Sequence, residues 1–546
     1  MGTVLSALRS VTKGATAVVK LLADLNRQYQ ALLTRVNAPP GLPYEKPSAP
    51  YWLDDPPFPE LVRARSEEMP GEADVVVIGS GITAAAVVWG LLFGSSKEEE
   101  EEEGKKVPRV VVLEARELCA GATGRNGGHV KASPHALFPR LAGVFGKERA
   151  RELVRFTLRT AGLVGEVGGG REVAAYRAVE TVDFFLDEAS FEGAKKEVAE
   201  LKLWIPEFEI RVMEREAARE EFGVQEQHVF GALVYEAGAL WPYRMVASCW
   251  REMLDKAAGR LSIETETAVE GIEVGDGGGT ERRPYVVRTG RGDVRARHVV
   301  HATNAHAAQS LPGLRGKMAG VKAHMSAQKS GGRFAWRDGR RSWSVLYGGG
   351  MFDYVTQRPN GDVMLGGGFA RSLGQGVDMV GVYEDGSTEG LTVAHVGGVM
   401  GAVFGDGWDG RVERVWSGII GVTGDMAPFV GRVPEGISGR KKGGKGKGVT
   451  LKKQVKKVEE EEDGGGWIGA EAGEWVSAGY SGDGMVWAWG CGAALGVMIS
   501  GREGEVLEKG PGFPGGRLEE WFPRDLVITE ARVRKADLSN LLDELM

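Results

Sequence analysis

The chain has 546 residues, of which 42% are hydrophobic and 26% charged, as in an ordinary globular protein with room for more than one lobe. Its formal net charge of −7 argues against general nucleic-acid binding. The three cysteines, Cys119, Cys249 and Cys491, show neither metal spacing nor a disulfide framework, and favour a reducing compartment such as the cytoplasm.

The N-terminal region has two parts. Residues 3–36 place apolar side chains at helical spacing, with basic residues outnumbering the single acid Asp24. Four alternatives are open: a helix docked on the body, a mitochondrial transit peptide, a membrane-surface helix that gives residues 1–36 a peripheral membrane contact, and N-myristoylation of the Met1–Ser6 pattern. Residues 37–70 are rich in proline and predict an extended wrap on the surface, anchored by aromatic side chains.

The most informative segment begins at Asp74. An apolar strand pattern, Asp74–Ile78, leads into Gly79-Ser80-Gly81-Ile82-Thr83-Ala84 and then into an expected helix over 85–92. This is a dinucleotide fingerprint. Gly79 permits the sharp turn, Gly81 lets a pyrophosphate approach the backbone, and Ala84 lets the helix pack closely. The free amides at the helix start then face the anion.

A second strand pattern, Val110–Leu113, ends at Glu114, which can accept hydrogen bonds from a ribose. Residues 95–106, with six consecutive glutamates, are expected to form a solvated insertion before it. The glycine-dense residues 115–129 follow. Such a loop favours FAD over NAD, because the ribityl chain and flavin ring extend past the pyrophosphate. A plain glycine-rich connection is the alternative.

The remaining chain predicts a mixture of elements. Residues 136–225 indicate mainly helices, and strands are expected at 267–272, 285–288, 294–303 and within 345–369. Residues 437–466 are basic and then acidic without interleaved aromatics, which predicts a disordered surface loop rather than a nucleic-acid site. An apolar helix is expected over 485–500.

Four motifs, in order along the chain, resemble one family. Gly121–His129 resembles the second FAD motif of the D-amino-acid oxidase/glycine oxidase superfamily, closest to its γ-glutamylputrescine oxidase-like branch. His301–Ala305 is similar to a strand end near the cofactor, Val415–Gly431 to a late segment beside the flavin, and Gly479–Met485 to the C-terminal flavin loop. The resemblance covers about residues 40–505.

The resemblance implies an α/β fold, in which a discontinuous Rossmann-type FAD-binding domain carries an inserted α+β substrate lobe with a mixed sheet. The division expected is an N-terminal helix (1–36), the proline-rich wrap (37–72), the FAD-binding domain (73–135, 226–314, 412–436 and 467–505), the substrate domain (136–225 and 315–411), the low-complexity loop (437–466) and a C-terminal extension (506–546).

The resemblance also implies a soluble FAD-dependent oxidoreductase acting on the C–N bond of a small-molecule amine or amino acid. Hydride would pass to flavin N5, the imine would be hydrolysed, and oxygen or another acceptor would reoxidise the flavin. Residues 417–421 lack the cysteine that attaches FAD in some members, so non-covalent FAD is expected. Residues 362–367 lack the lysine that promotes oxygen reaction in sarcosine oxidase-like members, which leaves oxidase or dehydrogenase open. No nucleic acid and no metal are expected.

The expected cofactor-binding residues come from all these segments: Gly79, Ser80, Gly81, Ile82, Thr83, Ala84, Glu114, Ala115, Arg116, Gly121, Ala122, Thr123, Gly124, Arg125, Asn126, Gly127, Gly128, His129, Val269, Ala302, Thr303, Asn304, Gly482, Asp483, Gly484 and Met485. Asp483 departs from the family's usual histidine, and an anion there would oppose a reduced flavin.

The catalytic residues are left unassigned, with two candidates. His129 is either near the flavin ring or a structural residue, and Arg125 faces a phosphate, a substrate carboxylate or a loop carbonyl. Tyr347, Tyr354 and Gln357 are weaker candidates for contact with substrate and are more typical of packing. Three rival functions remain: a flavin-binding protein without turnover, a membrane-surface protein and a NAD-linked dehydrogenase.

Overall fold

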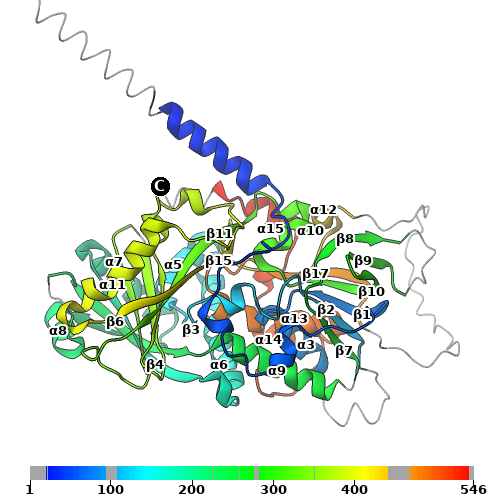
Figure 1. The fold of residues 1–546 in the computed structure, drawn as a ribbon, viewed down its shortest axis with the longest axis horizontal. Coiled ribbons are helices and arrows are strands. Elements are labelled where there is room, and N and C mark those ends of the chain that lie inside the picture. Colours follow the sequence, from blue (N-terminus) through cyan, green and yellow to red (C-terminus); the bar gives the residue numbers. More distant parts are fainter. Residues whose placement is uncertain are drawn as a thin grey trace, which may run out of the picture.

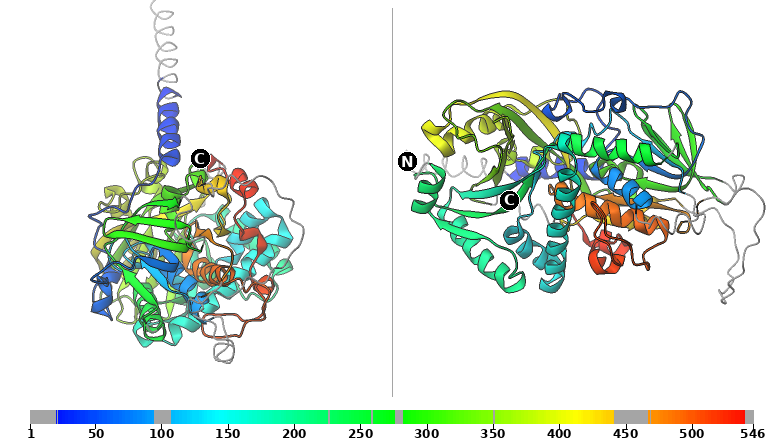
Figure 2. Two further views of the ribbon diagram at one scale, coloured as in Figure 1. Left: turned by 90° about the vertical axis from the view of Figure 1, so that its right-hand side faces the viewer. Right: turned by 90° about the horizontal axis from the view of Figure 1, so that it is seen from below.

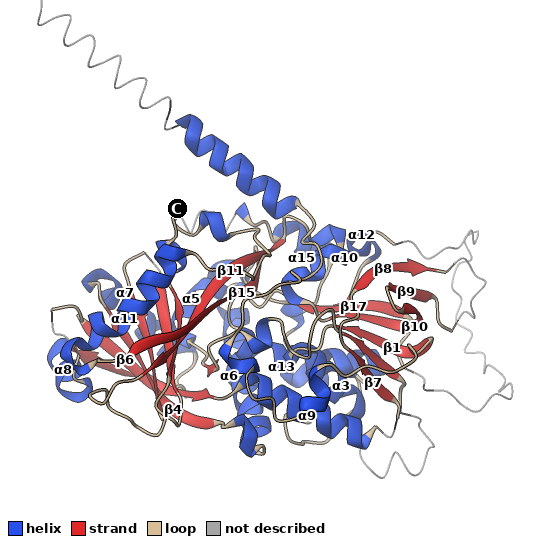
Figure 3. Cartoon of the chain, viewed as in Figure 1, coloured by secondary structure: helices blue, strands red, loops and turns tan. Residues whose placement is uncertain are grey.

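The computed structural model describes residues 20, 22–93, 107–224, 227–257, 259–275, 282–349, 351–440, 467 and 469–539. Within these ranges the chain forms two lobes side by side, each built on one sheet (Figures 1 and 3). The insertion expected at 95–106 and nearly all of the low-complexity loop, residues 441–466, lie outside the described residues. No helix of the described residues is long and apolar enough to cross a membrane.

The first sheet carries the fingerprint. Its strands run in the order β16-β17-β10-β1-β2-β7 and are mostly parallel, with β8 and β9 added antiparallel through β10. The strands are β1 (Glu72–Ile78), β2 (Val110–Leu113), β7 (Leu261–Glu264), β8 (Val269–Val274), β9 (Tyr285–Thr289), β10 (Gly292–His301), β16 (Phe429–Arg432) and β17 (Gly473–Ala478). The strands predicted at 74–78, 110–113, 285–288 and 294–303 are thus confirmed. β1 is buried almost throughout, as a central parallel strand requires.

Two apolar helices pack closely beneath this sheet. α3 (Ile82–Phe93) and α13 (Gly484–Ser500) are buried over nearly their whole length. Their backbones approach closely because the contact consists of small residues: a Cβ added to Gly496 would lie 2.5 Å from the carbonyl oxygen of Val87, and one at Gly90 would lie 2.6 Å from that of Ala493. This contact fixes the start of both helices at one edge of the sheet, where the fingerprint lies. α9 (Pro242–Lys256) packs beside α3.

The second sheet forms the other lobe. Its order is β15-β11-β14-β13-β12-β4-β6-β3, with β5 beside β6. The strands are β3 (His129–Val130), β4 (Arg177–Phe185), β5 (Arg211–Glu214), β6 (Gly231–Ala239), β11 (Met318–Lys329), β12 (Arg341–Leu346), β13 (Phe352–Gln357), β14 (Val363–Gly367) and β15 (Arg411–Thr423). All pairs are antiparallel except β12 with β4. The sheet is mixed, as expected.

Helices cover both faces of the second sheet or join it to the first. They are α5 (Pro134–Phe145), α6 (Lys147–Gly169), α7 (Glu188–Trp204), α8 (Arg215–Phe222) and α11 (Gly390–Phe404). The helices expected within 148–164 and 191–201 lie inside α6 and α7. The strand β4 was missed within the region predicted as mainly helical. Its sequence, RAVETVDFF, does not alternate strictly between polar and apolar residues, so the period of two that marks a strand is absent.

The helix expected at the N-terminus is present over its described residues and is docked on the body in part. Residues 22–37 are helical and project away from the body (Figure 2), with exposed side chains at Leu22, Leu25 and Tyr29. Leu32 and Val36 pack on the body, so only the end of this helix is docked. The segment that follows includes η1 (Tyr51–Leu53) and α2 (Pro59–Val62). Trp52 is 1% exposed, deep in the main core.

The C-terminal extension packs against the first lobe. It contains α14 (Leu518–Trp521) and α15 (Glu530–Lys535), and the short helices α10 (Ala307–Ser310) and α12 (Glu435–Ser438) lie nearby (Figure 1). Arg532 of α15 donates hydrogen bonds to the carboxylate of Asp425 and to three backbone carbonyls.

Candidate FAD site

A long cavity lies between the lobes. The fingerprint, the 114–126 loop and the loop before α13 supply its walls on the side of the first lobe, and β11, β13 and β15 supply the opposite wall. The lining residues are Gly41, Leu42, Pro43, Ile78, Gly79, Ser80, Gly81, Ile82, Thr83, Leu113, Glu114, Ala115, Arg116, Gly121, Ala122, Thr123, Arg125, Asn126, Val269, His301, Ala302, Thr303, Asn304, Ala305, His306, Gln309, Ser310, Ala323, Met325, Tyr354, Asp385, Gly418, Ile419, Ile420, Tyr480, Gly482, Gly484, Met485 and Ala488.

The fingerprint turn has the geometry that its glycines predict. Gly79 has φ +105, and a Cβ there would lie 2.7 Å from the carbonyl oxygen of Ala302. A Cβ at Gly81 would lie 2.8 Å from Oγ1 of Thr123, which itself accepts a hydrogen bond from the amide of Ile82 at 2.9 Å. The start of α3 is therefore bare backbone facing the cavity, and the amides of its first turn can bind an anion.

Glu114 lies at the end of β2, beside this turn. One carboxylate oxygen accepts hydrogen bonds from the amide and hydroxyl of Ser80, at 3.1 and 2.6 Å, and the other accepts from the amide of Arg116 at 2.9 Å. These bonds fix the carboxylate at the cavity wall. Because a carboxylate has about four acceptor positions, it keeps capacity for the hydroxyl groups of a ribose.

The loop before α13 closes one end of the cavity. Gly482 has φ +96 and no atom within 4 Å of an added Cβ, so the glycine leaves open space there. Between the lining residues Gly482 and Gly484 stands Asp483, whose pKa is raised to about 6, chiefly by burial, against the opposing charges of Arg140 and Lys131. Asp483 is nevertheless exposed to solvent at its surface, so solvent screening weakens this effect.

The wall from the second sheet is mainly apolar. Ala323, Met325, Ile419 and Ile420 line it, together with Tyr354. Met325, Gly366, Tyr354, Ser344 and Asp183 occupy one row of paired residues across five strands. Paired residues of neighbouring strands point to the same face, so this row faces the first lobe. Burial, and then the charge of Asp353, raises the pKa of Tyr354 to about 12, so its phenol is neutral.

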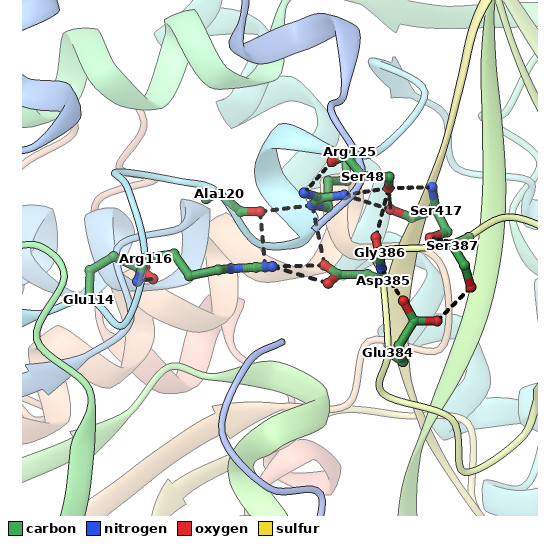
Figure 4. A network of polar contacts seen from close by, with 10 residues as sticks. All are labelled: Ser48, Glu114, Arg116, Ala120, Arg125, Glu384, Asp385, Gly386, Ser387 and Ser417. Carbon is green, nitrogen blue, oxygen red and sulfur yellow. Dashed lines mark hydrogen bonds and ion pairs between the residues drawn. The ribbon is translucent and has the colours of Figure 1, made fainter. Parts of the chain in front are cut away.

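A polar network joins four segments at the cavity wall (Figure 4). Asp385, from the loop before α11, accepts two hydrogen bonds from Arg116 at 3.0 and 3.2 Å and lies 3.4 Å from Nε of Arg125. Arg125 also donates to the backbone carbonyls of Ala120, Ser48 and Ser417, at 2.9, 2.8 and 2.7 Å. Burial lowers the pKa of Arg125 to about 10, although Asp385 opposes this shift.

Most of the predicted cofactor-binding residues meet at this one cavity. Those that do not line it are Ala84, Gly124, Gly127, Gly128, His129 and Asp483. The glycines among them support the wall instead. A Cβ at Gly127 would lie 2.7 Å from the ring of Tyr354, and one at Gly128 would lie 2.5 Å from the carbonyl oxygen of Leu240.

Of the two candidate catalytic residues, His129 lies outside the cavity, whereas Arg125 lines it but is bonded to loop carbonyls. His129 lies on β3 outside the lining, its Nε2 has no hydrogen-bond partner among the described residues, and burial lowers its pKa well below the usual value. The hydrogen bonds of Arg125 to backbone carbonyls favour the prediction that it faces loop carbonyls, rather than a phosphate or a substrate carboxylate. Tyr347 donates to Asp353 at 2.6 Å, and Gln357 donates to the carbonyl of Ala335 at 3.3 Å, so both side chains are engaged within the substrate lobe.

Several lining residues escaped the sequence reasoning. Gly41, Leu42 and Pro43 come from the proline-rich segment, Asp385 from a loop without a motif, and His306 and Gln309 from η4 (Asn304–His306) and α10. Their positions depend on how distant segments meet. A single signal was available: the glycine and prolines at 39–43 mark a segment whose backbone can approach another closely.

Comparisons with known proteins agree with this geometry. The model of a family described as DAO, FAD dependent oxidoreductase, matches residues 74–497. No curated protein matches the sequence. Among solved structures, glycine oxidase from Geobacillus kaustophilus is similar at 15% identity and a TM-score of 0.55, covering 81% of this chain and 98% of its own. L-proline dehydrogenase from P. horikoshii is similar at 17% identity and a TM-score of 0.56, covering 83% and 98%. L-amino acid deaminase from Proteus vulgaris is similar at 15% identity and a TM-score of 0.54, covering 84% and 99%.

The fold and the cavity define a dinucleotide-binding flavoprotein. The chain belongs to the DAO family of FAD-dependent oxidoreductases, and FAD is its cofactor. The cavity fits this group, because bare glycine backbone lines the end that would receive the diphosphate and an apolar wall lines the other. No cysteine is among the lining residues, in keeping with non-covalent binding. The family confirms the enzyme class and excludes the NAD-linked alternative. Membership of the γ-glutamylputrescine oxidase-like branch and the domain boundaries stay predictions.

Proposed function

We propose that the protein oxidises the C–N bond of a small-molecule amine or amino acid. The observation that carries this proposal is the apolar wall of Met325, Tyr354 and Ile419, which lines the same cavity as the glycine loop before α13. A flavin ring against this loop would leave its open face toward that wall. Solved structures of similar fold include an oxidase of glycine and a dehydrogenase of L-proline, which supports the same chemistry here.

FAD supplies the hydride acceptor for such a reaction: a hydride leaves the carbon beside nitrogen, a proton leaves the nitrogen, and water converts the imine to a carbonyl compound and an amine or ammonia. The protein has to exclude water and orient the amine. The apolar wall excludes water. The phenol of Tyr354 can orient the substrate, because it lines the cavity and makes no hydrogen bond to any described residue.

Asp483 is a candidate for receiving a proton. An amine must lose its ammonium proton before hydride can leave the neighbouring carbon. Asp483 lies at an exposed position between the lining residues Gly482 and Gly484, so a proton that it receives can pass to solvent. Its pKa, raised to about 6 by burial but subject to solvent screening, suits such an exchange near neutral pH. Lys131 and Arg140 nearby would then stabilise the carboxylate form.

The test is an anaerobic screen of the purified, FAD-loaded protein with amines and amino acids, following loss of the visible flavin absorption. We expect at least one compound to bleach the flavin and to yield the matching carbonyl product. Full retention of colour with every amine and amino acid would contradict the proposal and favour a flavin-binding protein without turnover. Admitting oxygen afterwards distinguishes an oxidase, which recovers its colour quickly, from a dehydrogenase.

A contact with a membrane surface is a second proposal for the N-terminal region, beside a cytoplasmic location. It is supported by the exposed Leu22, Leu25 and Tyr29 on the projecting helix, which could lie in a lipid interface. Sedimentation with anionic vesicles tests it: the full chain should co-sediment, and a chain lacking residues 1–36 should not. Equal sedimentation of both would refute the contact.

A further inference from the structure

The cofactor cavity is walled in part by chain segments outside the fingerprint domain. Gly41, Leu42 and Pro43 line it, and the amide of Gly41 donates to Oε1 of Gln309 at 2.9 Å. We call residues 41–54 the strap. The strap crosses the junction of the lobes (Figure 1), and Trp52 anchors its far end, because its indole N–H donates to the carbonyl of Asn126 in the glycine loop.

Ser48 ties the middle of the strap to the other lobe. Its amide and its hydroxyl both donate to the backbone carbonyl of Asp385, each at 2.7 Å. The hydroxyl oxygen also accepts from the amide of Ser417 at 3.0 Å and from Arg125 at 3.2 Å. One residue of the strap therefore contacts the loop before α11, strand β15 and the glycine loop of the first lobe (Figure 4).

The Asp385 carboxylate makes a second set of contacts in this polar network. Asp385 is 3% exposed and forms ion pairs with two guanidinium groups, those of Arg116 and Arg125. Both arginines also donate to the carbonyl of Ala120, at 3.1 and 2.9 Å, which is the residue before Gly121. The shape of the glycine loop at its start is therefore set by a carboxylate that comes from the other lobe.

Neighbouring side chains fix the loop that presents Asp385. Glu384 accepts hydrogen bonds from Lys322 at 2.8 Å, from Ser387 at 2.7 Å and from the amide of Gly386 at 2.5 Å. Burial alone would raise the pKa of Glu384, but these partners hold it at about 2. The loop that presents the Asp385 carboxylate is thus held by the hydrogen bonds of its neighbour Glu384.

We propose that Asp385 is a positioning residue for FAD: by binding Arg116 and Arg125 it fixes the glycine loop and fastens the strap along the cavity, so that it controls how slowly FAD leaves. Removing the carboxylate would leave Arg116 without its anionic partner at the cavity wall, and would leave Arg125 only carbonyl and hydroxyl partners. Because the glycine loop and the strap both line the cavity, loosening them should mainly speed the dissociation of FAD. The proposal rests on FAD as cofactor and not on oxidation of an amine.

The test compares the rate of FAD release from Asp385→Asn, Ser48→Ala and Asp54→Asn after dilution of the FAD-loaded proteins, followed by flavin fluorescence. Asp385→Asn keeps the shape of the side chain and removes its charge. Ser48→Ala removes a single hydroxyl and serves as the milder variant if Asp385→Asn fails to fold. Asp54→Asn is the control, because Asp54 lies on the same strap and forms an exposed ion pair with Arg414 at 2.7 Å.

We expect release to be about tenfold faster or more for Asp385→Asn, several-fold faster for Ser48→Ala, and unchanged for Asp54→Asn. In the double variant of Asp385 and Ser48, the increase in the rate of FAD release should be smaller than the product of the two single increases, because both residues act through Arg125. Release rates within twofold of the parent in both single variants would overturn the proposal. So would a loss of thermal stability in the apoproteins without faster release, which would mean a purely structural role. Neither result depends on whether an amine is oxidised.

Discussion

The phenol oxygen of Tyr480 lies 2.9 Å from Oγ1 of Thr83, so the loop before α13 is bonded directly to the first turn of α3. The same phenol lies 2.8 Å from Oγ of Ser477 on β17, and all three side chains are buried. Tyr480 also lines the cavity. One hydroxyl group thus holds the first and the last of the FAD-binding motifs in register, although they are separated by nearly 400 residues.

The first prediction concerns this bond. Tyr480→Phe should lower the free energy of unfolding by about 1–3 kcal/mol, because Thr83 and Ser477 lose a buried partner, and should weaken FAD binding. Urea unfolding of the apoprotein and titration with FAD measure the two effects. Tyr29→Phe, on an exposed side chain, is the matched control. An unchanged FAD affinity in Tyr480→Phe would show that the link between the motifs is not needed.

The fingerprint turn gives a second prediction. Gly79→Ala should abolish stable FAD binding and cost about 1–3 kcal/mol in unfolding free energy, because Gly79 combines φ +105 with a Cβ position 2.7 Å from the carbonyl oxygen of Ala302. Gly143→Ala in α5 is the matched change, since nothing lies within 4 Å of its Cβ position. It should be neutral or slightly stabilising. Equal behaviour of the two variants in thermal melts and FAD content would contradict this view of the turn.

Features that depend on local sequence could be predicted, whereas features that depend on contacts between distant segments could not. The Asp74–Ala84 segment specifies strand, turn and helix locally, because each glycine meets a requirement of the turn itself. The apolar run at 485–500 is long enough to indicate a buried helix. The roles of the strap and of Asp385 could not be foreseen, because they depend on contacts between residues 337 and 269 positions apart in the sequence. His129 illustrates the opposite case: the glycine loop lines the cavity only as far as Asn126, and His129 lies beyond it on β3, where it pairs with β6.

A third prediction concerns the buried pair of Lys131 and Asp183. Lys131 donates to Asp183 and, at 2.7 Å, to Ser344, and Tyr235 donates to Asp183 at 2.7 Å. Lys131→Met should destabilise the protein at pH 7 by about 3–5 kcal/mol, because it leaves a buried carboxylate without its cation. Adding Asp183→Asn should recover part of the loss, and urea unfolding of the single and double variants measures both. A loss under 1 kcal/mol for the single change would contradict the importance of this pair.

The loss of unfolding free energy in Lys131→Met should depend on pH in a definite direction. Burial would raise the pKa of Asp183, but Lys131, His135 and Tyr235 together lower it. A lowered pKa in the folded state stabilises the fold above the unfolded value and ceases to do so as the pH falls through the folded value. The difference between the parent and Lys131→Met should therefore be largest near neutral pH and shrink in acid. A difference that grows in acid would contradict the assignment.

A fourth prediction concerns Asp483 and the flavin potential. The pKa of Asp483 is raised to about 6, so its carboxyl is neutral below this pH and negative above it. A negative charge disfavours a reduced, anionic flavin, so the midpoint potential should fall more steeply with pH above about 6 than in Asp483→Asn. Anaerobic redox titration at several pH values measures this. Asp255→Asn, in an exposed ion pair with Arg251, is the control and should follow the parent. Parallel curves for the parent and Asp483→Asn would exclude Asp483 from the flavin's surroundings.

A crystal structure of the FAD-loaded protein would show directly where the cofactor binds. We predict density for the diphosphate at the amides of Gly81 and Thr83, and for the flavin ring between the loop at 482–485 and the wall of Met325 and Tyr354. Density for the flavin outside this cavity, or a cavity that stays closed to FAD while the protein binds one equivalent elsewhere, would contradict this prediction.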